Sequence, residues 1–405
     1  MTLLKIAFRN IFRQKRRTLL TGLSMFGGFV MASVFIGWAD GSYNHIIDNF
    51  TRHNFGHIQI HEKNYLDRPS LYKTIDTYPQ IRSRLDPIDE IDSHAPRVYS
   101  AGLVSVGEKS TGARIIGLDP LREKSTTKFD RKICEGRYFS LTPCYEALLG
   151  KELAKMLEAE VHDDIVVVSQ GADGSIANDR YTIVGLVDTG DPMTDRTSFY
   201  LHIQDAQELL VLGQRIHEII INIGRLKRVN QMTDRITREL DSPELSVAPW
   251  QVFARGFYLA MKADMEGLWI SLVIIVLIVA VGVLKTVLMS VLERTREYGV
   301  LKAVGTRPGQ IIKMILMEVN IMAVFSVIFG FGAALAVNSI LAVRGIDLGV
   351  EFTYGGMAFE TLKSEINARS FIIPAVTILL SACVVGFFPA LKAARTDAAR
   401  SMRTH

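Results

Sequence analysis

Four long apolar runs constrain the fold of this 405-residue chain more than any other feature. Three of them carry no charge and are 21, 25 and 22 residues long, at 18–38, 319–343 and 370–391. The fourth run, 267–292, has 26 residues and a single charge at Lys285. A helix needs about 20 apolar residues to cross a bilayer core of about 30 Å. All four runs are therefore predicted to be transmembrane helices.

Charge is distributed unevenly around these runs and predicts the orientation of the chain. Residues 1–17 hold six Lys and Arg and no acid, the segment 293–318 holds five, and the tail from Lys392 holds four. The positive-inside rule places these parts in the cytoplasm. Residues 39–265, with 27 basic and 33 acidic residues, and the loop 344–369 then lie outside. Because the net charge of +4 belongs to the membrane edges, nucleic acid is not a predicted partner.

The basic start of the chain has an amphipathic pattern. Apolar and basic residues form two stripes at helical spacing, namely Leu4, Phe8 and Phe12, and Lys5, Arg9, Arg13 and Arg17. The pattern predicts a cytoplasmic helix that contacts the membrane lipids at the inner headgroup layer. A plain cytoplasmic anchor sequence is the alternative.

The region 39–265 mixes strand and helix patterns. Stretches rich in β-branched residues and bounded by Gly, Asp or Ser indicate strands, whereas 151–160 and 225–240 indicate helices. The predicted strands are GHIQIH (56–61), GLVSVGE (102–108), ARIIGLD (113–119), DDIVVVS (163–169), RYTIVGLVD (180–188) and HEIIINIG (217–224). From Gln251 a helical pattern runs into the second apolar run and predicts a stalk helix. The predicted fold is an α-helical membrane protein with four transmembrane helices and a large α+β extracytoplasmic domain inserted between the first and second spans. In chain order the predicted parts are a cytoplasmic helix 1–17, a span 18–38, the extracytoplasmic domain with its stalk 39–265, a span 267–292, a cytoplasmic loop 293–314, a span 319–343, an outer loop 344–369, a span 370–391 and a cytoplasmic tail 392–405.

Small residues recur every four positions in two of the apolar runs. They form one stripe in the first run and one in the fourth, namely Ser24, Gly28 and Ala32, and Ala382, Gly386 and Ala390. Small stripes let helices approach closely in lipid, so both are candidate packing seams. The spacing leaves open whether each seam lies within the chain or against a second copy.

The sequence contains no motif that predicts catalysis. Phosphate-binding loops, nucleophile elbows and His-Glu-x-x-His motifs are all missing from it. His53, His57 and His61 recur every four residues, but the alternation around Ile58 and Ile60 indicates a strand. On a strand, His57 and His61 would lie about 13 Å apart, so a solvated strand face is predicted and a metal site is not.

Two of the three cysteines lie close together in the region 39–265. Cys134 and Cys144 flank the stretch EGRYFSLTP, and an oxidising compartment permits a bridge between them. A disulfide closing so short a loop would contribute about 2–3 kcal/mol. Two independent thiols are the equally open alternative.

The segment ERTREYGVLKAVGTRPGQI, which begins at Glu293, is a charge-dense stretch between two apolar runs. As a helix it pairs Glu293 with Arg296 and places Glu297 beside Arg294. Its second half is apolar, and Gly305 suits a left-handed helix cap. Because so short a helix is marginal in water, a binding surface is expected to hold it. A groove on a cytoplasmic protein suits the apolar patch and the acids; the inner headgroup layer is the alternative, although acids near anionic lipid are unfavourable.

Three stretches and the basic start resemble one known family. EGRYFSLTPCYEALLGKELAKML (135–157) is similar to the core of its periplasmic domains. ERTREYGVLKAVGTRPGQI matches its R-x-R-E-x-G-x-L-(K/R)-A-x-G segment after the second span, and this is the most specific match. PALKAARTDAARSMR resembles its C-terminal end, with Ala398 in place of the usual Pro. The family is the MacB/LolCE/FtsX superfamily of ABC-transporter permeases, and the resemblance covers nearly the whole chain.

The resemblance implies a four-span, non-enzymatic permease of the bacterial inner membrane with both termini in the cytoplasm. It implies a dimer with a second permease, identical or paralogous, and two copies of an ABC ATPase. Because this chain begins with the basic helix, the ATPase is expected on another polypeptide, which would hold the ATP and Mg²⁺; this chain would hold no cofactor. The segment from Glu293 would be the coupling helix, and its implied contacts with the ATPase are Glu293, Arg294, Arg296, Glu297, Gly299, Leu301, Lys302 and Gly305.

The resemblance also suggests a cargo. DNFTRHNFGHIQIHEKNYLD (48–67) looks most like the lipoprotein-releasing permeases, which implies release of a lipoprotein, or export of an amphipathic cargo. A periplasmic carrier protein is an implied further partner. The alternatives are an FtsX-like mechanotransmission regulator of an extracellular hydrolase and a MacB-like efflux permease. A membrane-anchored enzyme or receptor without an ATPase belongs to a different class of function.

Overall fold

The chain forms two compact units. The computed structural model describes residues 8–9, 13, 15–354 and 357–395, so most of the helix predicted at 1–17 and the end of the tail predicted at 392–405 lie outside the described residues. One unit, here called the helical unit, comprises Met1–Tyr43, Lys262–Leu348 and Thr361–His405. The other, the sheet unit, comprises Asn44–Met261 and Gly349–Glu360.

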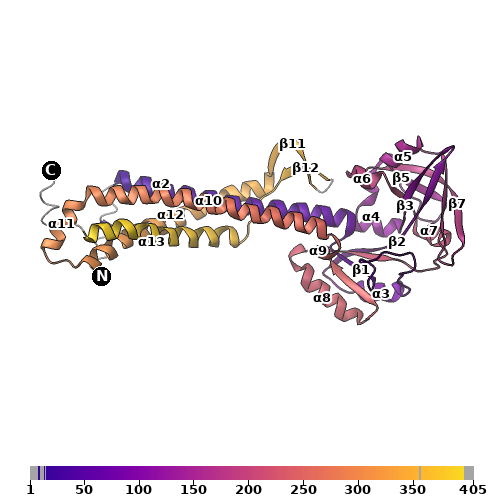
Figure 1. Cartoon of the computed structure of the whole chain (residues 1–405), viewed down its shortest axis with the longest axis horizontal. Coiled ribbons are helices and arrows are strands. Elements are labelled where there is room, and N and C mark those ends of the chain that lie inside the picture. The colour runs from indigo at the N-terminus through magenta and orange to yellow at the C-terminus, as the bar shows by residue number, and fades with distance from the viewer. Residues whose placement is uncertain (1–7, 10–12, 14, 355–356, 396–405) are drawn as a thin grey trace. The chain divides into compact units, whose positions relative to one another are not determined.

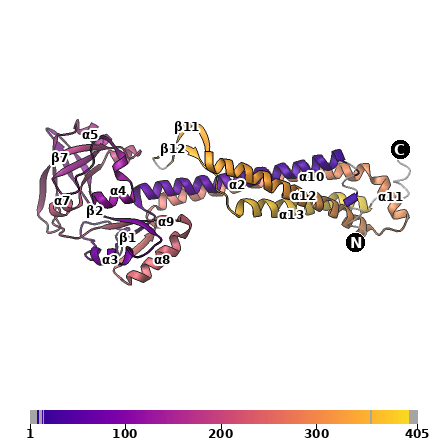
Figure 2. The same cartoon turned by 180° about the vertical axis from the view of Figure 1, so that it is seen from behind.

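The helical unit is built on four helices that are long and apolar enough to cross a membrane. They are α2 (Lys15–Phe50), α10 (Arg255–Glu293), α12 (Pro308–Arg344) and α13 (Arg369–Arg395). Each contains one of the four apolar runs, so the prediction of four such helices is confirmed. In both views α12 and α13 lie side by side (Figures 1 and 2).

Two shorter elements connect these helices. The helix α11 (Thr295–Ala303) lies between α10 and α12 in the chain, within the segment for which a short helix was predicted. A two-stranded hairpin, β11 (Ile346–Tyr354) and β12 (Met357–Leu362), lies between α12 and α13, where only a loop was predicted.

Both stripes of small residues pack within a single chain. A Cβ added at Gly28 would lie 2.5 Å from Cγ2 of Val279 on α10, and Ala32 is buried with Leu272 of the same helix. In the fourth apolar run, a Cβ at Gly386 would lie 3.5 Å from a methyl carbon of Leu316 on α12. Ala382 and Ala390 are buried, whereas Ser24 is partly exposed and donates to the carbonyl of Leu20. The sequence leaves open what each stripe packs against. In this structure, both stripes pack between helices of one chain.

The sheet unit is built on one 10-stranded mixed sheet (Figure 1). Its strands are β1 (Ile58–Glu62), β2 (Ile91–Val106), β3 (Lys109–Leu118), β4 (Ile133–Gly136), β5 (Glu146–Gly150), β6 (Asp164–Gln170), β7 (Ile176–Val187), β8 (Ser198–His202), β9 (Glu218–Ile223) and β10 (Leu245–Pro249). The order is β10-β1-β9-β2-β3-β8-β5-β7-β4, and β6 pairs with β2 and β7. The pairs β3–β8 and β5–β7 are parallel and the other ladders are antiparallel.

Short helices connect and cover the strands. They are α3 (Tyr78–Leu85), α4 (Pro120–Thr126), η2 (Phe129–Lys132), α5 (Lys151–Leu157), α6 (Pro192–Asp195), α7 (Ile203–Leu209), η3 (Leu226–Arg228), α8 (Val229–Leu240) and α9 (Trp250–Phe253). Two of these helices, α4 and α6, have N-cap hydrogen bonds. The carboxylates of Asp119 and Asp191 accept backbone N–H groups at their first turns. The prediction of a domain of mixed strands and helices is confirmed.

The cysteines of the sheet unit form no bridge in this structure. Cys134 and Cys144 are both exposed, free thiols. Cys134 lies at an irregularity in the β4–β7 ladder, where its Sγ is 3.4 Å from the carbonyl oxygen of Leu186. The sulfur of Cys144 instead lies 3.7 Å from the hydroxyl of Thr142. The two sulfurs thus contact different partners in this structure, and a bridge between them stays a prediction.

Candidate functional site

The end of α2 is bonded by side chains from several elements of the sheet unit. After Phe50 the helix widens into a π-turn, η1 (Thr51–Phe55), which closes when the N–H of Gly56 donates to the carbonyl of Thr51 at 2.7 Å. Gly56 has φ of +73°, and an added Cβ there would lie 3.0 Å from the backbone nitrogen of Ile221. Glycine at this position therefore permits both the left-handed turn and the close approach of β9.

The carbonyls of this last turn are satisfied by side chains of the sheet unit. The last carbonyls of a helix have no partner within the helix and need donors from elsewhere. The four bonds are Asn222 Nδ2 to Arg52 O (3.1 Å), Lys132 Nζ to His53 O (2.6 Å), Arg97 Nη1 to Asn54 O (2.8 Å) and Gln59 Nε2 to Phe55 O (2.8 Å). We call these four donor side chains the helix-end clamp. They come from the neighbouring strands β1, β9 and β2 and from η2, so pairing of these three strands is needed to assemble them.

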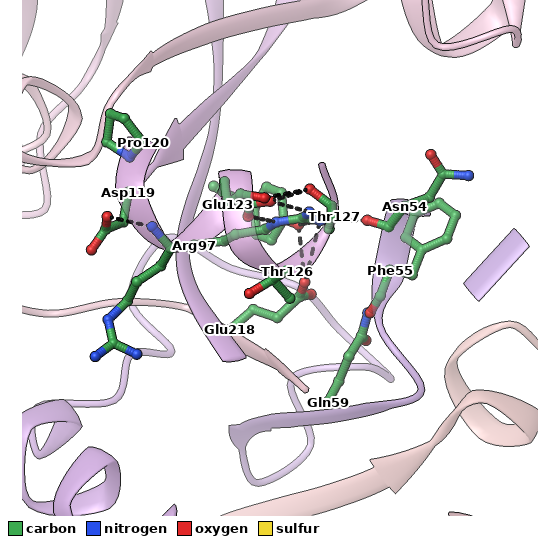
Figure 3. Close-up of polar contacts among 12 residues, drawn as sticks. Asn54, Phe55, Gln59, Arg97, Asp119, Pro120, Glu123, Thr126, Thr127 and Glu218 are labelled. Carbon is green, nitrogen blue, oxygen red and sulfur yellow. Dashed lines mark hydrogen bonds and ion pairs between the residues drawn. The ribbon is translucent and has the colours of Figure 1, made fainter. Parts of the chain in front are cut away.

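Arg97 is held in place by a buried ion pair. Its guanidinium bonds Glu123 through two nitrogens, at 2.6 and 3.1 Å, and the hydroxyl of Thr127 donates to the same carboxylate at 2.6 Å (Figure 3). The Arg97 and Glu123 side chains are 8% and 0% exposed. Burial alone would lower the pKa of Arg97, but the carboxylate of Glu123 raises it well above its usual value. The clamp thus contains a permanently charged donor in a fixed orientation.

Lys132 places a second cation at the end of the helix. Its ammonium bonds the carbonyl of His53 and, at 2.7 Å, the amide oxygen of Asn54. Burial, with a further contribution from the charge of Arg97, lowers the pKa of Lys132 to about 8. Cations at a helix C-terminus interact favourably with the helix dipole, so Arg97 and Lys132 stabilise the end of α2 by charge as well as by hydrogen bonding.

The structure contradicts the prediction that His57 and His61 lie on a solvated strand face. His57 and His61 are both fully buried, whereas the alternation of the sequence predicted a solvated face. His57 Nε2 lies 3.0 Å from Asp48 Oδ1 of α2, and His61 Nε2 lies 3.2 Å from Glu218 Oε2. The prediction was wrong because β1 lies inside the sheet, between β10 and β9, where each imidazole has a carboxylate partner and His61 also stacks on the ring of Tyr65.

The second candidate site is α11, which is fixed to its own bundle on one side. Tyr298 is 2% exposed and belongs to the core of the helical unit. Arg294, at the start of α11, bonds Glu297 at 2.8 Å and Glu318 of α12 at 3.3 Å. The ammonium of Lys302 donates to the carbonyl of Ala394 on α13. The helix is therefore attached to the third and fourth long helices.

The end of α11 has the predicted glycine cap. Gly305 has φ of +100°, its N–H donates to the carbonyl of Lys302, and the N–H of Thr306 donates to the carbonyl of Leu301. These two bonds are those of a Schellman motif. The predicted pair of Glu293 with Arg296 is not formed, because Glu293 ends α10 and the backbone leaves the helix at Arg294 before α11 begins. Arg294 makes the ion pairs instead.

The opposite side of α11 is open. Arg296, Val300 and Val304 follow one another at four-residue spacing and are exposed, with Val300 and Val304 at 49% and 82%. Ala303 and Gly305 are exposed beside them. We call Arg296, Val300, Ala303 and Val304 the α11 stripe. An exposed apolar stripe with a charge at one end is suited to contact with another protein.

The structure divides the residues that were predicted to contact an ATPase. Glu293, Arg296 and Gly305 are exposed and Glu297 is partly exposed, whereas Arg294 and Gly299 are buried by the chain itself. Leu301 and Lys302 are half-buried, Leu301 against the core of the helical unit. The valines of the stripe belong to the apolar second half of the segment, for which the sequence predicts a groove on a cytoplasmic protein.

The comparisons with known proteins cover both units. The family profile described as "MacB-like periplasmic core domain" matches residues 18–239, and that described as "FtsX-like permease C-terminal" matches residues 269–398. The chain is 23% identical over 320 residues to the "Lipoprotein-releasing system transmembrane protein LolC" of Neisseria meningitidis serogroup B, covering 76% of this chain and 77% of that protein.

Further relatives match with different coverage. The "ABC transporter permease YtrF" of Bacillus subtilis is 32% identical over 197 residues, 45% of this chain and 42% of that protein. The "Macrolide export ATP-binding/permease protein MacB" of Campylobacter jejuni is 23% identical over 97% of this chain, which spans 60% of that protein. A crystal structure of the periplasmic region of MacB from Actinobacillus actinomycetemcomitans covers 50% of this chain and 92% of that chain, with 16% identity and a TM-score of 0.37.

Proposed function

The chain belongs to the MacB/LolCE/FtsX superfamily of ABC-transporter permeases, and from this premise we propose that it converts ATP hydrolysis by a partner ATPase into movement of the sheet unit. It is a multi-pass protein of the bacterial inner membrane. The uneven charge supports an orientation with both termini and α11 in the cytoplasm and the sheet unit outside. The proposed assembly contains a second permease, identical or paralogous, and two copies of the ATPase.

The observation that carries this proposal is the two-sided character of α11. Its inner side is bonded to α12 and α13 through Arg294, Tyr298 and Lys302, while the α11 stripe is exposed. A partner that binds the stripe would therefore move the long helices when it changes shape. The Schellman cap at Gly305 fixes where the helix ends, which keeps the stripe in one orientation.

The proposed transmission continues at the far end of α2. Because the helix-end clamp bonds four successive carbonyls of that helix, a displacement of its last turn is expected to displace the sheet. In this proposal, force passes from the ATPase to the long helices at α11, and from α2 to the sheet at the clamp.

Charged substitutions in the α11 stripe test the ATPase contact. Val300→Asp and Val304→Asp place a carboxylate on the exposed apolar side, and each is expected to reduce co-purification of an ABC ATPase at least about tenfold. The matched control is Val168→Asp, an exposed valine of β6 in the sheet unit. The measurement is the amount of ATPase retained on the tagged permease and its ATP turnover after reconstitution. Full retention and turnover in both α11 variants would refute the proposed contact.

For the cargo, we propose lipoprotein release or export of another amphipathic molecule. Support comes from the similarity to proteins named as lipoprotein-releasing, which extends over 76% of the chain. Depletion of the permease is expected to retain lipoproteins in the inner membrane, measured by fractionation of labelled lipoproteins. A cell-separation defect with normal lipoprotein sorting would favour regulation of an extracellular hydrolase. Sensitivity to macrolides alone would favour efflux, the function for which the Campylobacter jejuni relative that matches 97% of the chain is named.

A further inference from the structure

The sheet unit contains a cavity of about 640 Å³ beside the helix-end clamp. Its walls include aromatic side chains from elements far apart in the sequence. Phe50 of α2 stacks on Phe257 of α10 with ring centroids 3.8 Å apart, and Phe129 meets the ring of Tyr200 edge-on at 4.9 Å. The volume is within the range of about 300–1,000 Å³ that small-molecule sites occupy. The cavity is thus large enough and apolar enough to bury the body of an organic ligand.

Two cations line this cavity without a carboxylate as their ion-pair partner among the described residues. The ammonium of Lys132 bonds only neutral oxygens, those of His53 and Asn54. The guanidinium of Arg114 lies over the ring of Tyr99, 4.5 Å from its centroid, and its residue is exposed. A third lining cation, Arg97, is already neutralised by Glu123. Lys132 and Arg114 therefore leave positive charge available to a ligand.

Among the described residues, one acid lines the cavity, and local bonds occupy it. The carboxylate of Asp191 accepts the backbone N–H of Met193 at 3.1 Å and the hydroxyl of Thr194 at 2.6 Å, which together cap α6. It is therefore oriented toward its own turn. The charge balance in the walls favours an anion over an organic cation.

We propose that this cavity is a binding site for one amphipathic anion, with its acid group between Lys132 and Arg114 and its apolar body against Phe50, Phe129, Tyr200 and Phe257. Such a ligand would contact Lys132 and Arg97 of the clamp and the aromatic pair that joins α2 to α10. Its binding would stabilise the contacts that attach the end of α2 and the beginning of α10 to the sheet. This inference goes beyond the proposed function, because it needs neither an ATPase nor a transported cargo.

Photolabelling of the full-length chain in lipid nanodiscs tests the site. The probes are decanoic acid, decanol and decylamine, each carrying the same aliphatic diazirine, and the readout is the position of the label in peptides of the sheet unit. The acid is expected to label peptides that contain Phe129 or Tyr200, the alcohol less, and the amine least. Equal labelling by acid and amine, or labelling outside these peptides only, would overturn the proposal.

Two variants test whether labelling by the acid depends on Lys132 and Arg114. Lys132→Met and Arg114→Gln are each expected to reduce labelling by the acid about tenfold, because each removes a charged partner of the ligand. Arg114 is exposed and lies outside the clamp, so its variant is informative even where Lys132→Met does not fold. The control is Lys155→Met, an exposed lysine of α5. Unchanged labelling in Arg114→Gln, with the control also unchanged, would reject the assignment.

Competition identifies the source of the anion. Unlabelled decanoate and lysophosphatidylglycerol share an acid group and one acyl chain, and displacement by either supports the site. Displacement by decanoate alone assigns a free acid, and displacement by the lysolipid alone assigns a membrane phospholipid. Failure of both competitors to displace the probe would mean that the labelling is unspecific and would overturn the proposal.

Discussion

Arg97→Met is expected to destabilise the sheet unit by about 3–5 kcal/mol, because it leaves the fully buried carboxylate of Glu123 without its guanidinium. The same change removes the donor to the carbonyl of Asn54 and so opens one of the four bonds of the clamp. The measurement is the thermal unfolding of the full-length protein with Trp38 and Trp269 replaced by Phe, so that tryptophan fluorescence reports on Trp250, which is buried in this unit.

A double variant separates the two effects of Arg97→Met. Arg97→Met with Glu123→Leu removes both charges, so most of the lost stability is expected to return. The bond to Asn54 is still missing in the double variant, so ATP-driven transport is expected to remain low while ATP turnover continues. Recovery of both stability and transport would contradict the role assigned to the clamp, and an unchanged melting temperature in the single variant would contradict the buried ion pair.

Arg294→Met is expected to have the largest effect in the helical unit. It removes the guanidinium that lies 3.3 Å from Glu318, in a pair whose side chains are 7% and 5% exposed. Loss of one partner of such a pair costs about 3–5 kcal/mol, and here the loss falls on the contact between α11 and α12. We expect a lower melting temperature and, in the reconstituted complex, ATP turnover that no longer drives transport.

The controls for Arg294 lie in the same segment. Arg296→Met removes a neighbouring charge that is exposed, and it is expected to leave the melting temperature unchanged. Arg294→Met with Glu318→Leu is expected to be more stable than Arg294→Met alone, since no buried charge is left. Equal melting temperatures for Arg294→Met and Arg296→Met would show that the pair with Glu318 does not hold α11.

The long helices were predictable because lipid requires uninterrupted apolar runs, a condition that composition alone reveals. The strands were predictable where β-branched residues cluster, as in β9, whose sequence is EIIINI. The first half of β2 was not predicted, because Pro96 interrupts its pattern. The strands β5 and β8 were also missed, since they are five residues long and buried along their whole length, which leaves no alternation to read.

The candidate sites differ in how far they could be predicted. The cap at Gly305 depends on a local preference of glycine, so sequence and structure agree. The clamp depends on Gln59, Arg97, Lys132 and Asn222, which are brought together by the pairing of β1, β9 and β2 and by the position of η2 beside them. Nothing in their separate surroundings marks them as donors to one helix end. The partners of Arg294 were missed for a similar reason, because Glu318 is on another helix.

The way in which the sheet unit holds the ends of α2 and α10 differs between the two. The last turn of α2 is attached by four bonds that carry load in parallel, so rotation of that turn is expected to rotate the sheet by the same angle. The chain enters α10 through α9 and a non-helical residue, Ala254, with φ of −102° and ψ of 41°. Bending between α9 and α10 is therefore expected to concentrate at Ala254, whereas no such residue separates the last turn of α2 from the side chains that bond it.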